Sequence, residues 1–316
     1  MTGSRASLDA PFIELIDGPT PVQEMDRLRR ALGGGPRLLV KRDDTISFGF
    51  GGNKIRKLEY EVAKAMSSGA DTLVTLGGIQ SNHARATAAV AAKLGLGCVL
   101  VINGSPQERP TGNALLDRLL GAEVEYIPSR NERAEASARV MERIRRDGRK
   151  PYLIPLGAST PVGAMGFVRA VAEMVDQNVI PDVIVHAGSS GGTQAGLIAG
   201  ITNYGLRTRV LAVSADDPAE SVRSTVRGIV RGIAGFESFN GQIDVDDTRV
   251  GAGYGAPTDA SREAQELAAR REGFFVDHTY TAKALGALIA WVRDGWLTPD
   301  QTVLFWHTGG QVGIFA

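Results

Sequence analysis

Short runs rich in β-branched residues alternate with longer segments of helical period from Asp71 onward, and this alternation is what most constrains the fold. It is typical of β–α units arranged around a parallel sheet. We expect strands at residues 72–76, 98–102, 123–127, 151–154, 183–186, 210–214 and 302–306. We expect helices between them, at residues 82–94, 113–120, 132–147, 162–175, 193–204, 259–272 and 281–293. The sequence therefore predicts an α/β protein with mostly parallel sheets.

The length of the chain leaves room for one large domain or two ordinary ones. Of its 316 residues, 43% are apolar and 22% are charged, which is the composition of a globular protein with a well-buried core. No repeat and no proline- or serine-rich linker divides the chain. We therefore expect any second domain to be an insertion into the first.

Charge and cysteine content limit the partners and the compartment. The 35 basic residues balance the 35 acidic ones, so neither nucleic acid nor an anionic membrane surface is expected as a partner. The longest apolar stretches, such as residues 284–292, are far below the roughly 20 residues of a membrane span. Residues 1–10 lack the pattern of a signal peptide, and Cys98 has no second cysteine with which to form a disulfide. We expect a cytoplasmic protein.

Glycine is over-represented, with 39 residues or about 12% of the chain against a typical value of about 7%. A first cluster at residues 49–52 runs directly into a helical pattern, in which Asn53 can act as N-cap and Lys54 lies in the first turn. The helix dipole disfavours an ammonium group there and favours the neutral amine, which is the form that attacks an aldehyde to give a Schiff base. The alternative is that Lys54 is a solvated surface lysine, as we expect Lys57 to be.

A second cluster, Gly77-Gly78, ends a buried-strand pattern and precedes Ser81 and Asn82 at the start of a helix. Residues at the carboxyl end of a parallel strand face the crevice where α/β proteins bind ligands. Ser81 is therefore a candidate for acid–base or substrate chemistry, and Asn82 is a candidate hydrogen-bond partner of a ligand. Both residue types also cap helices without any ligand, so the capping interpretation stays open.

The third cluster is the most informative, because an expected strand runs into a Gly/Ser/Thr loop and then into an apolar helix. Backbone N–H groups and hydroxyls of the loop can converge on an anion at the helix N-terminus. The residues concerned are Ser189, Ser190, Gly191, Gly192 and Thr193. The loop lacks the lysine of a P-loop and does not match G-x-G-x-x-G, which argues against a nucleoside triphosphate or a dinucleotide. It is typical of a phosphate site, with an ordinary strand-to-helix turn as the alternative.

A fourth cluster places Thr308 before two glycines at the end of the last expected strand. Its hydroxyl could face a ligand in the same crevice, or the segment could be a simple C-terminal turn. The histidines show neither H-E-x-x-H nor a cysteine partner at metal-ligand spacing, so we expect no metal site.

An imine-forming lysine, a phosphate cradle and hydroxyls at strand ends are together the groups that pyridoxal 5′-phosphate requires. The motifs that carry a family resemblance are Gly51-Gly52-Asn53-Lys54-Ile55-Arg56-Lys57-Leu58-Glu59, Gln80-Ser81-Asn82-His83, Gly163-Ala164-Met165-Gly166, Gly253-Tyr254-Gly255 and His307-Thr308-Gly309-Gly310. In content and order they resemble the D-cysteine desulfhydrase / 1-aminocyclopropane-1-carboxylate deaminase family of fold-type II pyridoxal-phosphate enzymes. The resemblance covers nearly the whole chain.

This resemblance implies a two-domain fold like that of the tryptophan synthase β subunit, with the cofactor between the domains. The larger, cofactor-binding domain would comprise residues 1–54 and 166–316, and the smaller inserted α/β domain would comprise residues 55–165. The resemblance also implies a homodimer.

The same resemblance assigns roles to individual residues. Lys54 matches the Schiff-base lysine, which also moves the substrate α-proton. Asn82 matches the residue at the cofactor 3′-oxygen, the third glycine cluster matches the phosphate loop, and Thr308 would lie near the pyridine nitrogen. Ser81 matches a serine beside the substrate, and Tyr254 and Tyr280 match two active-site tyrosines.

The implied reaction is elimination of a leaving group from Cβ of a small amino acid, with release of pyruvate and ammonia. The chain is therefore expected to be a lyase, and the hydrolase class is expected as well. Ring-opening deaminases of the family typically carry Glu and Leu where this chain has Thr281 and Thr308. We therefore expect chemistry like that of D-cysteine desulfhydrase.

Departures from the family pattern keep other substrates open. They are His278, Thr279 and Ala282 around the second tyrosine and Gln311 after the last glycines. The alternatives are an L-cysteate sulfo-lyase, a 1-aminocyclopropane-1-carboxylate deaminase, a β-replacement synthase of the same fold and, more distantly, a non-catalytic protein that binds pyridoxal phosphate.

Overall fold

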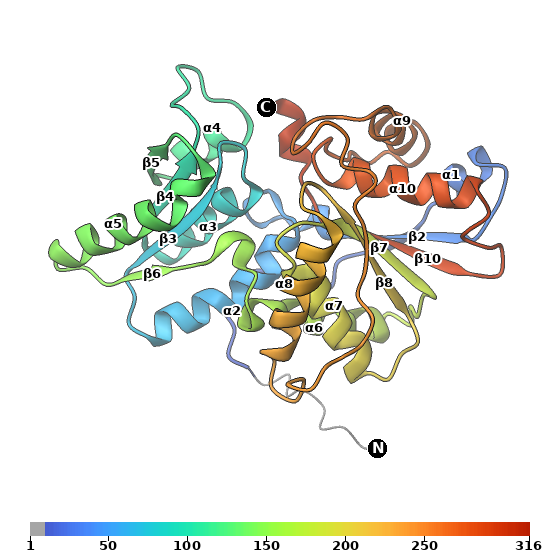
Figure 1. Cartoon of the computed structure of the whole chain (residues 1–316), viewed down its shortest axis with the longest axis horizontal. Helices are drawn as coiled ribbons and strands as arrows, with labels where there is room; N and C mark the ends of the chain where they lie inside the picture. Colours follow the sequence, from blue (N-terminus) through green and yellow to red (C-terminus); the bar gives the residue numbers. More distant parts are fainter. Residues whose placement is uncertain (1–9) are drawn as a thin grey trace.

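Two sheets form the framework of the computed structural model, which describes residues 10–316 (Figure 1). The larger sheet has the strand order β1 (Val22–Glu24), β2 (Arg37–Arg42), β10 (Thr302–His307), β7 (Val183–Gly188), β8 (Arg209–Ser214) and β9 (Asp244–Asp246). The smaller sheet has the order β5 (Glu123–Ile127), β4 (Gly97–Asn103), β3 (Thr72–Gly78) and β6 (Pro151–Leu153). Only the β1–β2 pair is antiparallel among these strands. The predicted α/β class with mostly parallel sheets is confirmed.

Helices cover both faces of the larger sheet (Figure 1). One face carries α1 (Asp26–Ala31), α9 (Asp259–Leu267) and α10 (Thr281–Arg293), and the other carries α6 (Pro161–Asp176), α7 (Gly192–Asn203) and α8 (Ala219–Arg231). Because successive strand residues point to opposite faces of a sheet, β10 packs against the helices on both sides. Val303 and Phe305 pack in the cluster of α10, whereas Leu304 and Trp306 pack in that of α6 and α7.

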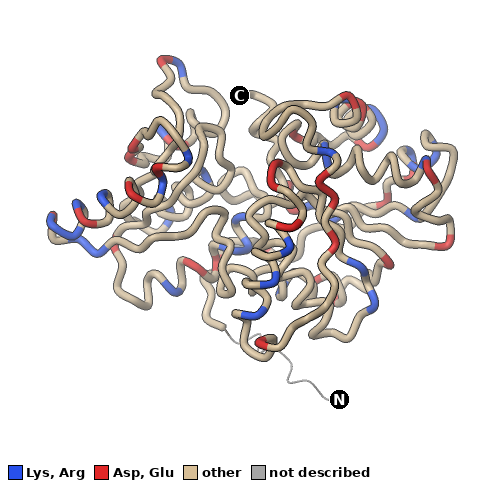
Figure 2. The backbone as a smooth tube through the Cα atoms, in the orientation of Figure 1, with Lys and Arg blue, Asp and Glu red and all other residues tan. Residues whose placement is uncertain are grey.

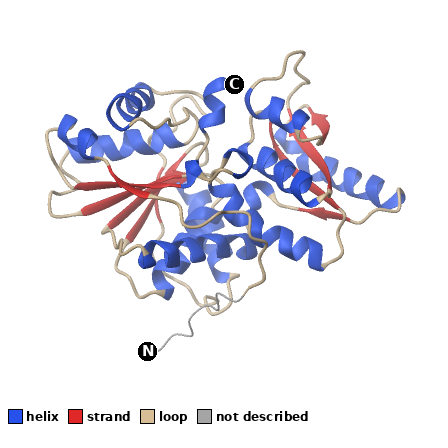
Figure 3. Ribbon diagram, turned by 180° about the vertical axis from the view of Figure 1, so that it is seen from behind, coloured by secondary structure: helices blue, strands red, loops and turns tan. Residues whose placement is uncertain are grey.

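The smaller sheet is covered in the same way by α2 (Asn53–Ser67), α3 (Asn82–Leu94), α4 (Gly112–Leu119) and α5 (Arg133–Arg146) (Figure 3). In β4, Val99 and Val101 pack with α5, whereas Leu100 and Ile102 pack with α3. Short 3₁₀ segments occupy Asp43–Thr45, Phe48–Phe50, Arg130–Glu132, Leu156–Ala158 and Gln311–Phe315, and a π-helical turn occupies Ala268–Glu272.

All the expected strands and helices are present, with ends that differ by a few residues, and the structure adds β1, β2, α1, α8 and β9. The expectation that Asn53 is an N-cap is wrong. Gly52 is the N-cap of α2, with φ +94°, and Asn53 is already helical. The Asn53 side chain instead donates a hydrogen bond to Thr193 Oγ1 at 2.9 Å, so it joins α2 to α7.

The helix that carries Lys54 is fixed against α6 by close backbone contact and by buried charges. Gly166 of α6 lies against the Arg56 carbonyl of α2, where a Cβ atom would overlap it. The buried Arg56 guanidinium donates to Asp43 at 2.8 Å and to Glu173 of α6 at 2.8 Å. Because buried charges are stable only when paired, this network defines the position of α2.

The division of the chain into domains at residues 55 and 165 stays a prediction. Both boundaries fall inside helices, α2 and α6, that pack on each other. Basic and acidic residues are interspersed along the tube (Figure 2), in keeping with the balanced charge. Within residues 10–316, no helix combines the length and the apolar character that a membrane span needs. The expectation about a signal peptide concerns residues 1–10, nearly all of which lie outside the described part.

Candidate active site

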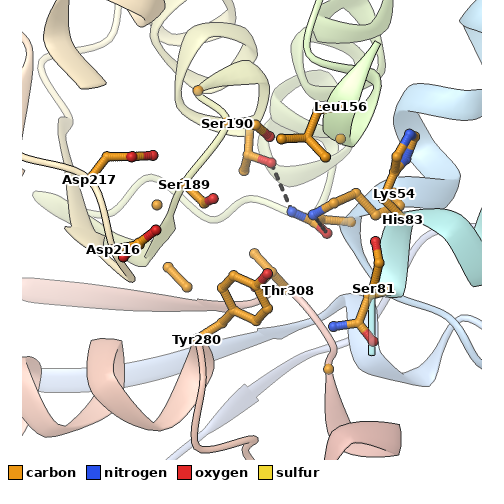
Figure 4. Close-up of a pocket in the computed structure, with 18 of the residues that line it drawn as sticks. Lys54, Ser81, His83, Leu156, Ser189, Ser190, Asp216, Asp217, Tyr280 and Thr308 are labelled. Atoms are coloured by element: carbon orange, nitrogen blue, oxygen red, sulfur yellow. Dashed lines mark hydrogen bonds between the residues drawn. The ribbon is translucent and has the colours of Figure 1, made fainter. Parts of the chain in front are cut away.

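A cavity of about 290 Å³ opens where the carboxyl ends of strands from both sheets meet (Figure 4). This volume is near the lower end of the range for small-molecule sites, about 300–1,000 Å³. Gly78 and Asn103 line it from the smaller sheet, and Gly188, Asp216 and Thr308 line it from the larger sheet. It brings together nearly all of the predicted site residues: Lys54, Ser81, Asn82, Ser189, Ser190, Gly191, Thr193, Tyr254, Tyr280 and Thr308. Gly192 lies next to these residues but is not part of the lining.

Lys54 lies in the first turn of α2, as predicted, and its Nζ donates to Asn53 Oδ1 at 2.8 Å. Burial and, second, the nearby Arg85 guanidinium together lower the pKa of the Lys54 amine to about 8, while Asp277 opposes the shift. A substantial fraction of the amine is therefore neutral near physiological pH. That is the state in which a lysine can attack an aldehyde.

The third glycine cluster forms the N-terminus of α7, where Gly191 adopts φ +83° as N-cap. The hydroxyl of Ser159, from the segment before α6, accepts the Gly192 N–H at 3.1 Å and lies 2.8 Å from Ser190 Oγ. Hydroxyls and N–H groups thus converge at a helix N-terminus, which is an arrangement that suits a phosphate group. Sequence reasoning missed Ser159, because nothing near it in the chain marks it as a ligand residue.

Lys57 was expected to be solvated, and this expectation is wrong: its residue surface is only 1% exposed. It lies one turn after Lys54 on the same face of α2, and its Nζ is 3.5 Å from Ser159 Oγ. Burial first, and the Lys54 charge second, hold the pKa of Lys57 well below its usual value, while Glu61 opposes this. An anion bound in the adjacent cradle would favour the charged form of this amine, so Lys57 is a candidate phosphate ligand. Its i, i+3 spacing from Lys54 was the signal that could have revealed it.

Ser81 and Asn82 both line the cavity and take part in structural hydrogen bonds at the start of α3, so the ligand-facing and the capping interpretations of this segment are compatible. Ser81 is the N-cap of α3, and its Oγ accepts the Ala84 N–H at 3.2 Å. Asn82 Oδ1 accepts a hydrogen bond from Asn113 Nδ2 at 2.9 Å. Because both residues also line the cavity, their caps and side-chain bonds hold them in place beside any ligand.

Tyr254 and Tyr280 share a hydrogen bond between their hydroxyls at the opposite wall. Asp277 accepts the Tyr280 N–H at 2.9 Å and the Thr281 hydroxyl at 2.7 Å, which fixes the start of α10. Burial raises the pKa of both tyrosines, that of Tyr280 well above its usual value. Both hydroxyls therefore carry their protons at neutral pH and can donate them.

The donor set fits pyridoxal 5′-phosphate. The cofactor needs an amine for its aldehyde, donors for a dianionic phosphate and neutral groups around its ring. Lys54 supplies the amine, Lys57 with the loop at Ser190 supplies the phosphate donors, and Thr308 lies buried at the end of β10. Within residues 10–316, no three His, Cys, Asp or Glu side chains are placed to hold a metal ion.

Comparisons with known proteins point to the same cofactor. The family model described as pyridoxal-phosphate dependent enzyme matches residues 13–309. The D-cysteine desulfhydrases of Salmonella typhi and of Salmonella choleraesuis are each 38% identical to this chain, covering 97% of it and 96% of the relative. A solved structure titled as an ACC deaminase homologue superposes with a TM-score of 0.90 at 36% identity, covering 97% of this chain and 94% of that one. A fungal L-serine ammonia-lyase from Rhizomucor miehei, with a TM-score of 0.71 at 19% identity and 96% of both chains covered, shares the fold. The chain therefore belongs to the family of pyridoxal-phosphate dependent enzymes.

Proposed function

We propose that this cavity catalyses β-elimination from a small β-substituted amino acid, with D-cysteine and water converted to pyruvate, sulfide and ammonia. The observation that carries the proposal is the Lys54 amine, with its pKa near 8, in one cavity with the phosphate cradle and two protonated tyrosines. The relatives that are 38% identical over nearly the full chain and named D-cysteine desulfhydrase support the choice of substrate.

The residues divide the work as follows. Pyridoxal phosphate, when bound, supplies an electron sink for the negative charge that develops at Cα. Lys57 and the loop at Ser190 hold its phosphate. The Lys54 amine removes the proton from Cα, since a neutral amine at that pKa is a competent general base. Tyr280, hydrogen-bonded to Tyr254, donates a proton to the departing sulfur. Ser81 and the first N–H groups of α3 orient the substrate carboxylate.

The classification as a lyase is supported by the names of these relatives, and the expected hydrolase class is corrected. In a desulfhydrase reaction the Cβ–S bond breaks by elimination, and water enters only when the amine is released.

A second candidate, opening of the cyclopropane ring of 1-aminocyclopropane-1-carboxylate, is favoured by the ACC deaminase homologue that superposes at a TM-score of 0.90. Thr281 and Thr308 stand against it, since the family resemblance implies that ring-opening members typically carry Glu and Leu there.

The experiment measures pyruvate, sulfide and ammonia released by cofactor-loaded protein from D-cysteine, L-cysteine and 1-aminocyclopropane-1-carboxylate, each offered separately. Equal amounts of pyruvate, sulfide and ammonia from D-cysteine are expected. An α-keto acid from the cyclopropane substrate alone would move the chain to the ring-opening class. Incorporation of an added thiol into an amino-acid product, without pyruvate, would indicate a β-replacement synthase.

We further propose that the enzyme is a cytoplasmic homodimer. This proposal rests on the family resemblance and on the single cysteine, Cys98, which leaves no internal disulfide. Light scattering coupled to size-exclusion chromatography tests the oligomeric state, with twice the 33.5 kDa mass of the chain as the expected result.

A further inference from the structure

One buried asparagine next to the cavity uses both ends of its side-chain amide and has no role in the reaction as proposed. Asn113 is the second residue of α4, is fully buried and is not part of the cavity lining. Its Oδ1 accepts a hydrogen bond from Arg85 Nε at 3.2 Å. Its Nδ2 donates to the Gln80 carbonyl at 3.0 Å and to Asn82 Oδ1 at 2.9 Å. Because Asn82 does line the cavity, a chain of hydrogen bonds leads from Arg85 to the ligand site.

The neighbours of Asn113 allow its amide only one orientation. The Arg85 guanidinium can only donate and the Gln80 carbonyl can only accept, so the amide oxygen must face Arg85 and the NH2 group must face Gln80. Arg85 is itself fixed, because it is 1% exposed and donates to the carbonyl oxygens of Gly49 and Gly51. Burial lowers the pKa of Arg85 to about 10, so the guanidinium stays charged at neutral pH.

The orientation of Asn113 fixes that of Asn82 in turn. The second N–H of Asn113 Nδ2 points to Asn82, which presents its oxygen at 2.9 Å. The NH2 group of Asn82 keeps two N–H donors. Among residues 10–316 no acceptor takes either of them, and Asn82 lies in the cavity lining. The structure therefore leaves these two donors for a ligand.

We propose that Asn113, oriented by Arg85, is a positioning residue that holds the Asn82 N–H donors toward the 3′-oxygen of bound pyridoxal phosphate. The inference rests on the proposed function, in which the cavity binds this cofactor, and on the match of Asn82 to the residue at that oxygen. Donors that are fixed there stabilise negative charge on the oxygen. An amide that is free to make a half-turn would present its carbonyl oxygen instead, which repels that charge.

The test compares how tightly the protein, after removal of its cofactor, binds pyridoxal phosphate and the analogue 3-deoxypyridoxal phosphate, which lacks this oxygen. Equilibrium dialysis gives both dissociation constants. Their ratio isolates the contact with the 3′-oxygen, since both ligands carry the same phosphate and aldehyde. Asn113→Asp keeps the size of the side chain and the acceptor for Arg85, but its carboxylate draws the NH2 group of Asn82 away from the cavity. It should weaken pyridoxal phosphate binding on the order of 10- to 100-fold, the value of a charge-assisted hydrogen bond, and analogue binding less than about threefold.

Two further variants serve as controls. Gln80→Ala removes the bond at 2.8 Å from the Asn113 N–H to Gln80 Oε1, so it loosens the start of α4 and leaves the Asn113 side chain unchanged. It should not alter the ratio. In an Asn82→Ala background, Asn113→Asp should change the ratio less than about threefold, because the effect passes through the Asn82 amide. Asn113→Leu repeats the test without adding a charge, and should reduce the preference for pyridoxal phosphate at least about threefold.

The visible absorbance of the bound cofactor gives a second readout. Loss of the donors disfavours negative charge on the 3′-oxygen, so the midpoint of the absorbance titration should rise in Asn113→Asp. The expected rise is about one pH unit or more, since one unit corresponds to about 1.4 kcal/mol. The midpoint should stay unchanged in Gln80→Ala.

Three results would overturn the inference. The first is an equal loss of affinity for both ligands in Asn113→Asp, which would leave Asn113 a purely structural role. The second is an undiminished effect in the Asn82→Ala background. The third is a wild type that binds the analogue as tightly as pyridoxal phosphate.

These measurements are independent of the reaction, so the two proposals can fail separately. If no amino acid is turned over, the proposed elimination is refuted. A ratio that changes in Asn113→Asp and not in Gln80→Ala would still support the positioning role.

Discussion

At the residue scale, the chemistry depends on two lysines one turn apart on α2. The local sequence made Lys54 a candidate, because a lysine at a helix N-terminus after glycines is unusual, and the family resemblance assigned it the role of the Schiff-base lysine. It did not identify Lys57, because burial of a lysine depends on the segment that covers it. That segment includes Ser159, about 100 residues away in the chain, and no local pattern reports such a contact.

The lowered pKa of Lys54 predicts how the cofactor-free protein takes up pyridoxal phosphate. With a pKa of about 8, roughly one amine in ten is neutral at pH 7, and most are neutral above pH 9. The initial rate of cofactor capture should therefore rise with pH, reach half of its plateau near pH 8 and level off above about pH 9. Stopped-flow absorbance at a series of pH values measures this rate. A rate that keeps rising toward pH 10.5 would mean that the pKa of Lys54 is not lowered.

Lys57 should determine cofactor affinity rather than the covalent link. Replacing it with methionine removes a buried amine beside the phosphate cradle, which a bound phosphate would keep charged, and a charge-assisted hydrogen bond is worth about 1.5–3 kcal/mol. Lys57→Met should weaken cofactor binding on the order of 10- to 100-fold in equilibrium dialysis. Lys64→Met, at an exposed position of the same helix, is the control and should leave affinity unchanged. Equal affinity in both variants would refute the assignment of Lys57.

At the scale of secondary-structure elements, the sequence predicted most of the buried strands and the helices that follow them. It missed the short strands β1 and β9, the helices α1 and α8, and β2, whose four buried residues lie between Arg37 and Arg42. The period of α8 was present in the sequence, with Val222, Val226 and Ile229 buried along one face. The helix crossings that position the site could not be predicted from the sequence. They depend on contacts between a glycine of one helix and the backbone of another, and no local pattern reports such pairs.

The crossing of α2 and α6 should tolerate no side chain at Gly166. A methyl group there overlaps the Arg56 carbonyl, two residues after Lys54, so the helices must move apart. Gly166→Ala should lower the free energy of unfolding by about 1–3 kcal/mol and weaken cofactor binding, both measured in urea titrations with and without cofactor. Gly228→Ala is the matched control, because Gly228 is a helical glycine with open space around it. There the change should be stabilising, by up to about 1 kcal/mol.

The buried ion network under α2 should make the protein sensitive to acid. Burial raises the pKa of Glu173, but the Arg56 and Lys41 charges outweigh this and lower it to about 2. A carboxyl with a depressed folded-state pKa contributes stability above its unfolded value of about 4.5, and this is lost as the pH falls toward 2. The loss amounts to about 3 kcal/mol, since each pKa unit corresponds to about 1.4 kcal/mol.

Glu173→Gln should therefore show a shallower fall in unfolding free energy between pH 5 and pH 2 than the wild type, although it is less stable at pH 7. Urea titrations at several pH values measure both curves. Parallel curves would mean that Glu173 does not titrate with a depressed pKa.

At the scale of the whole molecule, function depends on the meeting of two sheets. Parallel strands were predicted from alternation, but their partition into a six-stranded and a four-stranded sheet was not. Strand order requires knowledge of pairing, which local sequence does not carry. The cavity wall is a product of that meeting, because Arg133 and Asn103 come from the part built around the smaller sheet and Tyr254 and Tyr280 from the part built around the larger one. Only the family resemblance placed a cofactor between the two parts.

The most direct test of the account is to identify the lysine that binds the cofactor covalently. Borohydride reduction of the cofactor-loaded protein fixes the link, and fragment spectra of its peptides locate the added phosphopyridoxyl group. The account predicts this group on Lys54, with Lys57 unmodified, and its absence from Lys54→Ala. Modification at Lys57 in place of Lys54, or a fully active protein without any modified lysine, would contradict it.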